Sequence, residues 1–220
     1  DAGAEISARD QKTREQLGDR GTELQALGVE LVLGPGYLDG LERFDAVVVS
    51  PGVPKSLPEL QAAARRGPLE SEISLFFRYC QAPIYGITGS SGKTTTTSLV
   101  GEILKESGFS TFVGGNIGNP LIAEVGRLGV RDRVVLELSS FQLEDLKASP
   151  PGAVLTNIAE NHLDVHGSME NYIAAKKNIY LWQSPDDFVV LNYDDPLTRA
   201  LAQGAPGKVF FFSMENKVRD

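Results

Sequence analysis

The stretch YGITGSSGKTTTTSLVG, residues 85–101, decides the fold, because a glycine-rich loop in it joins an apolar strand to a helix. We predict the strand at Ile84–Thr88, the loop at Gly89–Gly92 and the helix from Gly92 to Ser107. This order brings backbone N–H groups and a helix N-terminus toward an anion, as in phosphate-binding loops. A common phosphate loop has glycine six positions before the lysine, where this chain has Ile87. A tight turn capped by serine and threonine is the alternative, and the flanking strand and helix favour the phosphate site.

Short apolar runs alternate with longer helix-like segments, which is typical of a parallel sheet flanked by helices. Further strands are expected at Ala4–Ser7, Glu30–Leu33, Ala46–Ser50, Thr111–Val113, Val134–Leu138, Ala153–Asn157, Phe188–Leu191 and Val209–Phe212. Further helices are expected at Pro58–Arg66, Ser168–Trp182 and Asp195–Ala202. Pro83 precedes the strand of the phosphate loop, so we place a domain boundary near residues 80–83. The predicted fold class is α/β, with a small unit over residues 1–80 and a parallel-sheet nucleotide-binding unit over residues 81–220.

The composition is that of a globular protein and excludes some functions. A formal net charge of −8 argues against non-specific nucleic-acid binding, which needs a basic face. Cys80 is the only cysteine, so the chain can form neither an internal disulfide nor a thiolate metal cluster. No apolar run approaches the roughly 20 residues that span a bilayer, and the first residues lack a signal-peptide pattern. We expect a cytoplasmic protein.

Residues in and after the loop point to phosphate and metal chemistry. Lys93 is placed to reach a terminal phosphate, and the Thr94 hydroxyl to join a Mg²⁺ shell. The threonines of Thr94–Thr97 are mediocre helix formers, so their hydroxyls favour ligand contacts, at least at Thr94. Glu137 interrupts an otherwise apolar strand, and a buried carboxylate is costly unless it is paired or binds metal. We predict that Glu137 holds Mg²⁺ directly or through water, rather than facing solvent on an edge strand.

A second polar cluster follows the expected strand Ala153–Asn157. Both histidines of the chain, His162 and His166, lie there, at a strand end where α/β proteins form ligand sites. We expect a metal or substrate role for His162, with His166 either behind it or exposed to solvent. Lys176 and Lys177 follow on the next helix, where paired lysines usually form a solvated face. The small residues before Lys176 favour a tighter environment that holds its amine near a metal.

Several segments, in order along essentially the whole chain, resemble the Mur ligase family, ATP-dependent amide-forming enzymes of cell-wall peptidoglycan synthesis. They are VVVSPGVP (47–54), TGSSGKT (88–94), GGNIGNP (114–120), VLELSSFQLE (135–144), NIAENHLDVHGSMENYIAAK (157–176) and LNYDDP (191–196). The phosphate loop of that family has the same glycine spacing, so the mismatch at Ile87 is itself a family trait.

The resemblance implies a role for each matching residue. The ATP phosphates would be bound by Gly89, Ser90, Ser91, Gly92, Lys93, Thr94 and Thr95, and the adenine by Asn192. One Mg²⁺ would be held by Thr94 and Glu137, and a second by His162 and a carbamylated Lys176. The muramoyl-alanyl end of the substrate would meet Asn116, Ser139 and His162, and its uridine-nucleotide end Asp10, Ser50 and Gly52. The catalytic residues would be Lys93, His162 and Lys176.

The resemblance also implies the reaction and the partners. Within the family, the segment ELSSFQLE resembles the member that joins UDP-N-acetylmuramoyl-L-alanine to D-glutamate with ATP and Mg²⁺. A substrate carboxylate would attack the γ-phosphate, and the amine of D-glutamate would then displace phosphate from the acyl phosphate. Positioning and charge neutralisation would supply most of the catalysis. We expect a monomer that binds neither nucleic acid nor membrane.

The chain departs from the family pattern in two respects. Ser91 stands where the family usually has asparagine, which would weaken a hydrogen bond that braces the loop. The family's opening strand and glycine-rich turn would precede Asp1, and its C-terminal domain, with the D-glutamate pocket, would follow Asp220. The resemblance therefore implies a fragment that does not catalyse the full reaction alone. It would have a partial Rossmann-like first domain and a P-loop ATPase-like central domain, without the C-terminal domain.

Three alternatives stay open at this point. A Mur ligase for another amino acid or a folylpolyglutamate synthase-type ligase would share the phosphate loop, but ELSSFQLE disfavours both. A non-catalytic nucleotide-binding module would need no function for Lys176. A kinase with an ordinary phosphate loop is disfavoured by the shifted glycines and by the pair His162 and Lys176.

Overall fold

The structure, a computed structural model, describes residues 3–51, 53–118 and 120–218. Its contacts divide the chain into two compact units, Asp1–Glu70 and Ser71–Asp220. The helix just before the expected boundary belongs to the second unit, because Ile73 and Phe76 are buried in the core of that unit. The contacts therefore place the boundary earlier than the residues 80–83 expected from the sequence.

The first unit contains two pairs of parallel strands with short helices between them. Strand β1 pairs with β2, and β3 pairs with β4. The elements are β1 (Ser7–Asp10), α1 (Arg14–Leu17), α2 (Asp19–Ala26), β2 (Glu30–Leu33), η1 (Leu41–Arg43), β3 (Val47–Val48), α3 (Pro58–Ala64) and β4 (Leu69–Glu70). A small buried cluster supports this unit and consists of Leu41, Val49, Leu60 and Ala63. Parallel strands joined by helices match the expected partial Rossmann-like unit.

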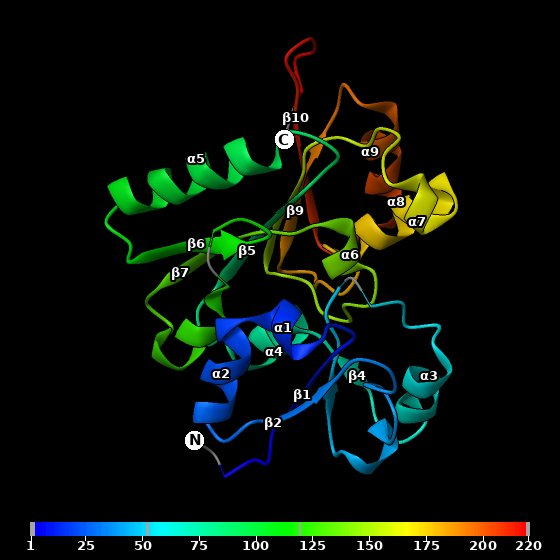
Figure 1. Cartoon of the computed structure of the whole chain (residues 1–220). Coiled ribbons are helices and arrows are strands. Elements are labelled where there is room, and N and C mark those ends of the chain that lie inside the picture. The colour runs from blue at the N-terminus through cyan, green and yellow to red at the C-terminus, as the bar shows by residue number, and fades with distance from the viewer. Residues whose placement is uncertain (1–2, 52, 119, 219–220) are drawn as a thin grey trace. The chain divides into compact units, whose positions relative to one another are not determined.

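The second unit is built on one sheet of six parallel strands (Figure 1). Its strands are β5 (Ile84–Thr88), β6 (Thr111–Gly115), β7 (Arg133–Glu137), β8 (Gly152–Leu155), β9 (Phe188–Asn192) and β10 (Lys208–Phe212). Its helices are α4 (Glu72–Tyr79), α5 (Lys93–Glu106), η2 (Leu121–Arg127), α6 (Ser140–Leu143), α7 (Leu163–His166), α8 (Met169–Lys177), α9 (Pro196–Leu201) and η3 (Ala202–Gly204). The parallel-sheet α/β fold expected from the sequence is confirmed.

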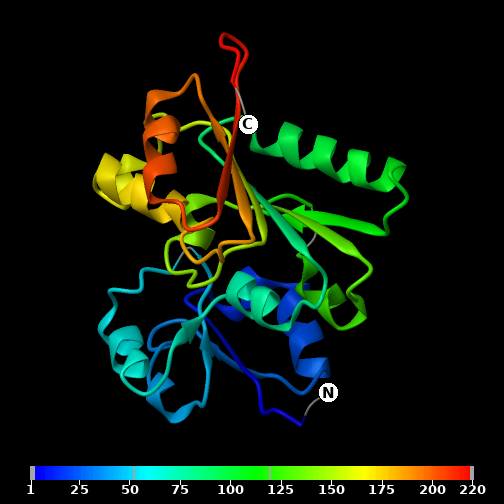
Figure 2. The same ribbon diagram turned by 180° about the vertical axis from the view of Figure 1, so that it is seen from behind.

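The strand order β10-β9-β8-β5-β7-β6 places the phosphate-loop strand β5 in the middle of the sheet. The chain leaves β5 toward β6 and later returns past it to β8, so connections on opposite sides meet beside β5. Ligands bind at such a switch point, beyond the carboxyl ends of the strands. Helix α5 lies on the opposite side of the sheet from α8, as Figures 1 and 2 show. Because the strands are parallel, the loops after β5, β7, β8 and β9 lie at the same edge of the sheet, beyond the carboxyl ends of the strands.

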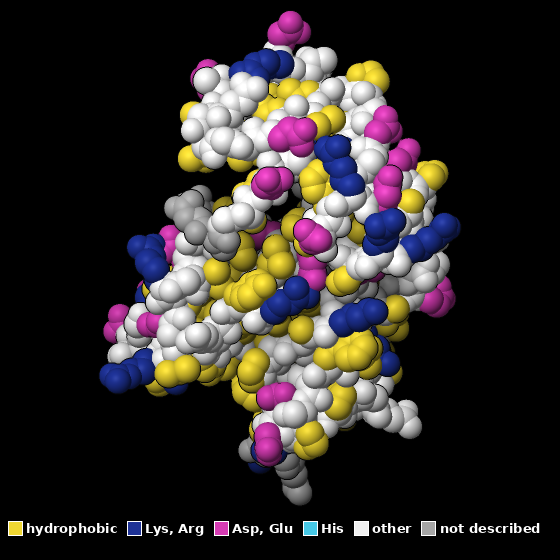
Figure 3. Space-filling model, turned by 90° about the horizontal axis from the view of Figure 1, so that it is seen from below, with side chains coloured by type: hydrophobic (Ala, Val, Ile, Leu, Met, Phe, Trp, Pro, Cys, Tyr) yellow, Lys and Arg dark blue, Asp and Glu magenta, His cyan; other side chains and the backbone are white. Residues whose placement is uncertain are grey.

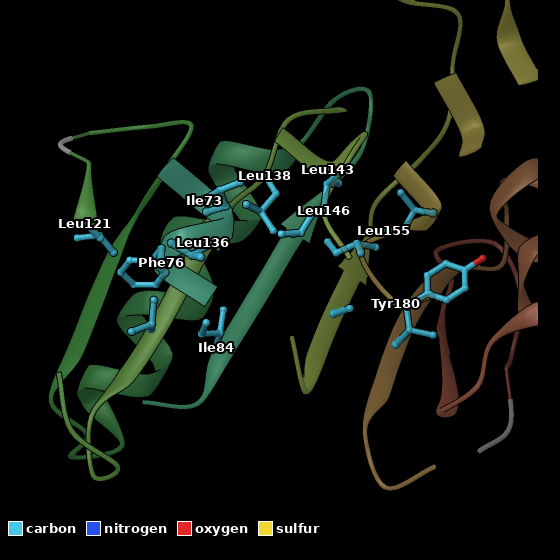
Figure 4. Close-up of a cluster of buried hydrophobic side chains, with 14 of the residues drawn as sticks. Ile73, Phe76, Ile84, Leu121, Leu136, Leu138, Leu143, Leu146, Leu155 and Tyr180 are labelled. Carbon is cyan, nitrogen blue, oxygen red and sulfur yellow. The ribbon is translucent and has the colours of Figure 1, made fainter. Parts of the chain in front are cut away.

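The core of the second unit lies between the sheet and the helices of one face. Figure 4 shows apolar side chains from α4 and from the neighbouring strands β5 and β7 packed together. Phe76, Leu136 and Leu155 are almost completely buried in it. Each such side chain contributes roughly 1.5–3 kcal/mol to burial free energy. This packing fixes the strand ends that carry the polar loops.

Most predicted elements are confirmed, with shifts at their ends. Strand β5 has the predicted bounds, but β1 begins three residues later than Ala4–Ser7, where Ser7 enters register with Glu30. The helix expected at Ser168–Trp182 ends at Lys177, because the Asn178 side chain turns to the carbonyl oxygens of the preceding segment 143–144. The short helices α1, α2, α6 and α7 and strand β4 were not predicted.

The described residues bear on two expected absences, a membrane span and a broad basic field, the second on one face only. Every helix of residues 3–51, 53–118 and 120–218 is too short or too polar to cross a bilayer. On the face in Figure 3, the visible basic and acidic side chains are interspersed. The face in this view therefore offers no single-sign surface of the kind that binds nucleic-acid phosphates.

Candidate functional site

The phosphate loop leads directly into the N-terminus of the long helix α5. Gly92 caps this helix at φ 77°, a left-handed conformation that glycine adopts without a Cβ penalty. The first turn of α5 carries no acidic residue, and no side chain caps its N–H groups. A helix N-terminus of this kind attracts anions through its free N–H groups and its dipole. The site is therefore suited to phosphate.

Ile87 explains why the common glycine pattern fails here. Its side chain is 0% exposed and packs within the sheet, so this position belongs to the strand and not to the loop. The glycine that the loop does require is Gly89, at φ 153°. A Cβ on Gly89 would overlap the Thr156 hydroxyl oxygen. The loop after β5 and the loop after β8 thus fit against each other with no room for a side chain.

Hydrogen bonds from the β8 loop brace the phosphate loop. The Thr156 hydroxyl donates to the Ser91 carbonyl oxygen at 2.6 Å, and the Ser91 N–H donates to Asn157 Oδ1 at 3.0 Å. Asn157 Nδ2 also donates to the Ser91 hydroxyl oxygen at 3.0 Å. The serine that departs from the family pattern therefore still braces the loop, through its short hydroxyl.

Glu137 ends strand β7 and is 2% exposed. The Thr94 hydroxyl donates to one of its carboxylate oxygens at 2.7 Å, and Asn116 Nδ2 donates to the other at 2.8 Å. Both partners are neutral donors, so neither offsets a negative charge on the carboxylate, and its oxygens have unused lone pairs for a cation. The structure thus brings together Thr94 and Glu137, and it places Asn116 beside them. The alternative of a solvent-facing glutamate is wrong.

The two lysines of the expected site meet at the phosphate loop. Lys93 Nζ donates to the Gly89 carbonyl oxygen at 3.0 Å, and Lys176 Nζ donates to the same oxygen at 2.9 Å. Lys176 is 1% exposed and lies over the ring of Tyr172, 4.7 Å from its centroid. Desolvation by burial, and next the charge of Lys93, lower the Lys176 pKa from 10.5 to about 7. A substantial fraction of Lys176 amines therefore carries no charge near pH 7, and an uncharged amine can be chemically modified.

This pKa shift predicts how stability depends on pH. The folded protein loses the Lys176 proton near pH 7, whereas the unfolded chain keeps it up to its ordinary pKa of 10.5. Between these values the unfolded state binds more protons, so the lysine's destabilising effect is full below pH 7 and is relieved as pH rises. In CO₂-free buffer, urea midpoints of the wild type and of Lys176→Met should differ most at about pH 6.5 and least at about pH 9.5. A difference that stays constant would contradict the shift.

The two histidines differ in burial. His162 is exposed, has a left-handed backbone at φ 53° and lies against the Phe141 ring at 5.2 Å. Within residues 3–51, 53–118 and 120–218, His162 forms no hydrogen bond with Lys176 or Glu137. His166 is buried at 5% exposure, so of the two expected alternatives the solvent-exposed one is wrong and a position behind His162 stays a prediction.

Other expected site residues have defined structural partners. Ser139 caps helix α6, and its hydroxyl accepts from the Gln142 N–H at 3.3 Å. Asn192 Nδ2 donates to the Thr156 carbonyl oxygen at 3.0 Å, which ties the end of β9 to the β8 loop. Thr95 is exposed on the first turn of α5. Ser90 donates to the Ala159 carbonyl oxygen at 2.9 Å.

In the first unit, the expected substrate residues lie near strand ends. Asp10 ends β1, and its carboxylate accepts from the Lys12 N–H at 2.9 Å. Ser50 follows β3 and is exposed. Gly52 lies outside the described residues.

The donor set fits Mg²⁺ at Glu137. Hydroxyl and carboxylate oxygens are the ligands that Mg²⁺ prefers, and it usually takes few protein ligands beside substrate phosphates. Among the described residues, no three His, Cys, Asp or Glu side chains gather into a metal centre. Lys176 as an ammonium would repel a metal, so a metal role for it requires the carbamate.

The sequence did not single out three residues that shape this site. Thr156 and Asn157 brace the phosphate loop, and the Tyr172 hydroxyl lies 3.0 Å from the Ser90 hydroxyl. A usable signal was the spacing of Tyr172, one helical turn before Lys176. The roles of Thr156 and Asn157 depend on the pairing of β5 with β8.

The comparisons with known proteins agree with this geometry. The Mur ligase middle domain matches residues 87–220. A UDP-N-acetylmuramoylalanine--D-glutamate ligase of Symbiobacterium thermophilum is 52% identical over 212 residues, which are 96% of this chain and 47% of that protein. The chain thus spans about half the length of the curated relatives it matches.

Solved structures share the fold. The UDP-N-acetylmuramate:L-alanyl-gamma-D-glutamyl-meso-diaminopimelate ligase from Neisseria meningitides superposes with a TM-score of 0.62 at 20% identity, over 96% of this chain and 71% of that one. The MurF ligase from Thermotoga maritima in complex with ADP superposes with a TM-score of 0.56 at 20% identity, over 97% and 49%. These two structures show the fold, whereas the Mur ligase middle-domain match covers more than half of the residues and shows that the chain belongs to the Mur ligase family.

Proposed function

We propose that this chain is the nucleotide-binding and carboxylate-activating part of an ATP-dependent ligase that joins D-glutamate to UDP-N-acetylmuramoyl-L-alanine. The observation that carries the proposal is the convergence of Lys93, Lys176 and the Thr94–Glu137 pair around one phosphate loop. The name of the 52% identical relative supports the choice of amino acid and substrate.

The phosphate loop binds ATP in this proposal. The phosphates are bound by residues 89–95, through the backbone N–H groups at the start of α5 and the Lys93 amine. Lys93 holds loop carbonyl oxygens in the structure, so binding exchanges two weak backbone acceptors for a charged phosphate. Asn192 contacts the adenine from the end of β9. The MurF ligase of Thermotoga maritima was solved in complex with ADP, which supports a nucleotide in this fold.

Two groups of residues hold Mg²⁺ in this proposal. Thr94 and Glu137 would hold one ion, and His162 with a carbamylated Lys176 would hold a second. When bound, Mg²⁺ neutralises phosphate and carboxylate charge, which lowers the repulsion between the two anionic substrates. The Gly89 carbonyl and the Tyr172 ring fix the direction of the Lys176 side chain.

The protein's own residues position the reactants. Asn116, Ser139 and His162 orient the muramoyl-alanyl end so that its carboxylate attacks the ATP γ-phosphate, and ADP leaves. Lys93 stabilises the charge that develops during this transfer. The amine of D-glutamate then attacks the acyl phosphate, and phosphate leaves as the amide forms. Asp10, Ser50 and Gly52 of the first unit bind the uridine-nucleotide end.

The experiment is to measure ADP release by the full-length protein with UDP-N-acetylmuramoyl-L-alanine and each candidate amino acid. We expect turnover with D-glutamate and little with L-lysine, meso-diaminopimelate or glycine. Turnover with another amino acid but not with D-glutamate would overturn the proposed specificity. ATP hydrolysis that no amino acid stimulates would favour a nucleotide-binding module instead. The cytoplasmic location and the monomeric state stay predictions.

A further inference from the structure

His166 is a buried histidine that no step of the proposed reaction uses. Its side chain is 0% exposed, and its Nε2 lies 3.0 Å from the Ser140 hydroxyl oxygen. Its ring stacks on Phe141, with centroids 5.0 Å apart and planes inclined by 10°. On the other side, the ring contacts Tyr172 at 5.3 Å. His166 therefore packs between helix α6, which carries Ser140 and Phe141, and helix α8, which carries Tyr172.

The surroundings of His166 select one tautomer. Its Nδ1 is buried without a hydrogen-bond partner in the described structure, and a Glu144 carboxylate oxygen lies 3.7 Å away. This distance is too long for a hydrogen bond, but the negative charge favours a proton on Nδ1 and opposes a bare lone pair there. With Nδ1 protonated, Nε2 accepts a hydrogen bond from the Ser140 hydroxyl.

The order Ser140, His166, Glu144 has the polarity of a hydrolytic triad, but the serine cannot act as a nucleophile here. Ser140 is 3% exposed, within the first turn of α6. A nucleophile must reach its substrate, and a buried hydroxyl does not. These three side chains are therefore suited to fixing helix α6 in place and not to cleaving a bond.

The residues that contact His166 also contact residues of the candidate site. Phe141 lies between His166 and the exposed His162, at 5.0 Å and 5.2 Å. Ser139, which caps α6, directly precedes Ser140. On the other side, the Tyr172 hydroxyl reaches Ser90 of the phosphate loop. A shift of α6 would therefore move Ser139, Phe141 and with it His162, whereas the phosphate loop keeps its own braces.

We propose that His166 is a positioning residue, which fixes α6 through its hydrogen bond with Ser140 and so aligns Ser139 and His162 with the muramoyl substrate. The inference rests on the proposed function, because it assigns those two residues to that substrate.

The test uses the full-length protein with His166→Phe, His166→Gln and Ser140→Ala. Phenylalanine keeps the ring contacts but removes the acceptor, whereas the glutamine amide oxygen reaches the place of Nε2 and accepts from Ser140. For His166→Phe and Ser140→Ala we expect the KM for UDP-N-acetylmuramoyl-L-alanine to rise about tenfold, as loss of one buried hydrogen bond implies. The KM for ATP should stay within about threefold, and His166→Gln should restore the first KM to within about threefold.

Two measurements separate positioning from general support of the fold. The double variant His166→Phe/Ser140→Ala should be no worse than either single variant, because both remove the same bond. Nitrogen NMR of the wild-type protein, with the His166 signal assigned from His166→Gln, should show a protonated Nδ1 and an unprotonated Nε2. This measurement needs no ligase activity, so it tests the inference even if the proposed function fails.

Three results would overturn the inference. The first is a wild-type KM for UDP-N-acetylmuramoyl-L-alanine in His166→Phe. The second is activity that His166→Phe retains and His166→Gln loses. The third is a proton on Nε2 of His166 in the wild-type protein. A wild-type protein without ligase activity but with the expected tautomer would count against the proposed function and not against the Ser140–His166 bond.

Discussion

Replacing Lys176 by alanine is expected to lower ligase turnover of the full-length protein by roughly 10²–10³-fold, as for loss of a preorganised charge-stabilising group. The physical reason is that a 1% exposed amine with a pKa of about 7 is neutral in a large fraction of molecules at neutral pH. A neutral amine adds to CO₂, losing a proton as the N–C bond forms, and yields the carbamate. The ammonium is thereby replaced by anionic oxygens, which also removes the repulsion with Lys93.

The matched control for this variant is Lys177→Ala, the neighbouring lysine on the same helix, which should retain near-normal turnover. A short carboxylic acid such as acetate should partly restore Lys176→Ala, because it supplies the missing oxygens, and it should not affect Lys177→Ala. The measurement is ADP release with both substrates. A Lys176→Ala protein with normal turnover would remove the carbamate from the mechanism.

Glu137→Gln is expected to lower turnover by at least about 100-fold at a Mg²⁺ concentration that saturates the wild-type protein. It should also raise the Mg²⁺ concentration that gives half-maximal activity. Glutamine has the same shape, so its amide can still accept from Asn116 and donate to the Thr94 hydroxyl. The folded structure should therefore survive, and only the negative charge is lost. The measurement is the Mg²⁺ dependence of ADP release, together with the melting temperature.

Glu106→Gln provides the matched control for the charge change, since Glu106 lies at the other end of α5, on its exposed surface. This variant should have the wild-type Mg²⁺ dependence. An unchanged Mg²⁺ dependence in Glu137→Gln would assign the buried carboxylate to bracing Thr94 and Asn116 alone.

The parallel sheet was predictable because each of its strands is a short apolar run bounded by polar residues. Ile84–Thr88 has its observed bounds for this reason, since the glycine at 89 ends it. The start of β1 was not predictable in the same way: Ile6 is apolar but 59% exposed, and the pairing of Ser7 with Glu30 sets the register. Tertiary pairing overrides local composition in such cases.

The candidate site was predictable where residue chemistry is unusual for its position. Glu137 within an apolar strand and Lys93 after a glycine loop are signals of this kind, and the structure brings Glu137 to Thr94 on α5. Thr156 and Asn157 carried no such signal, because threonine and asparagine are ordinary at strand ends. Their contacts to the loop exist only because β8 lies beside β5 in the sheet.

The close fit of Gly89 against Thr156 bears on engineering of this enzyme family. A library that randomises the phosphate loop alone would return glycine at position 89, because any side chain there would overlap the Thr156 hydroxyl. Transplanting residues 88–94 into another parallel sheet would likewise fail to hold the loop's shape without Thr156 and Asn157. The two strand-end loops are one module for mutagenesis and for grafting, although they are far apart in the gene.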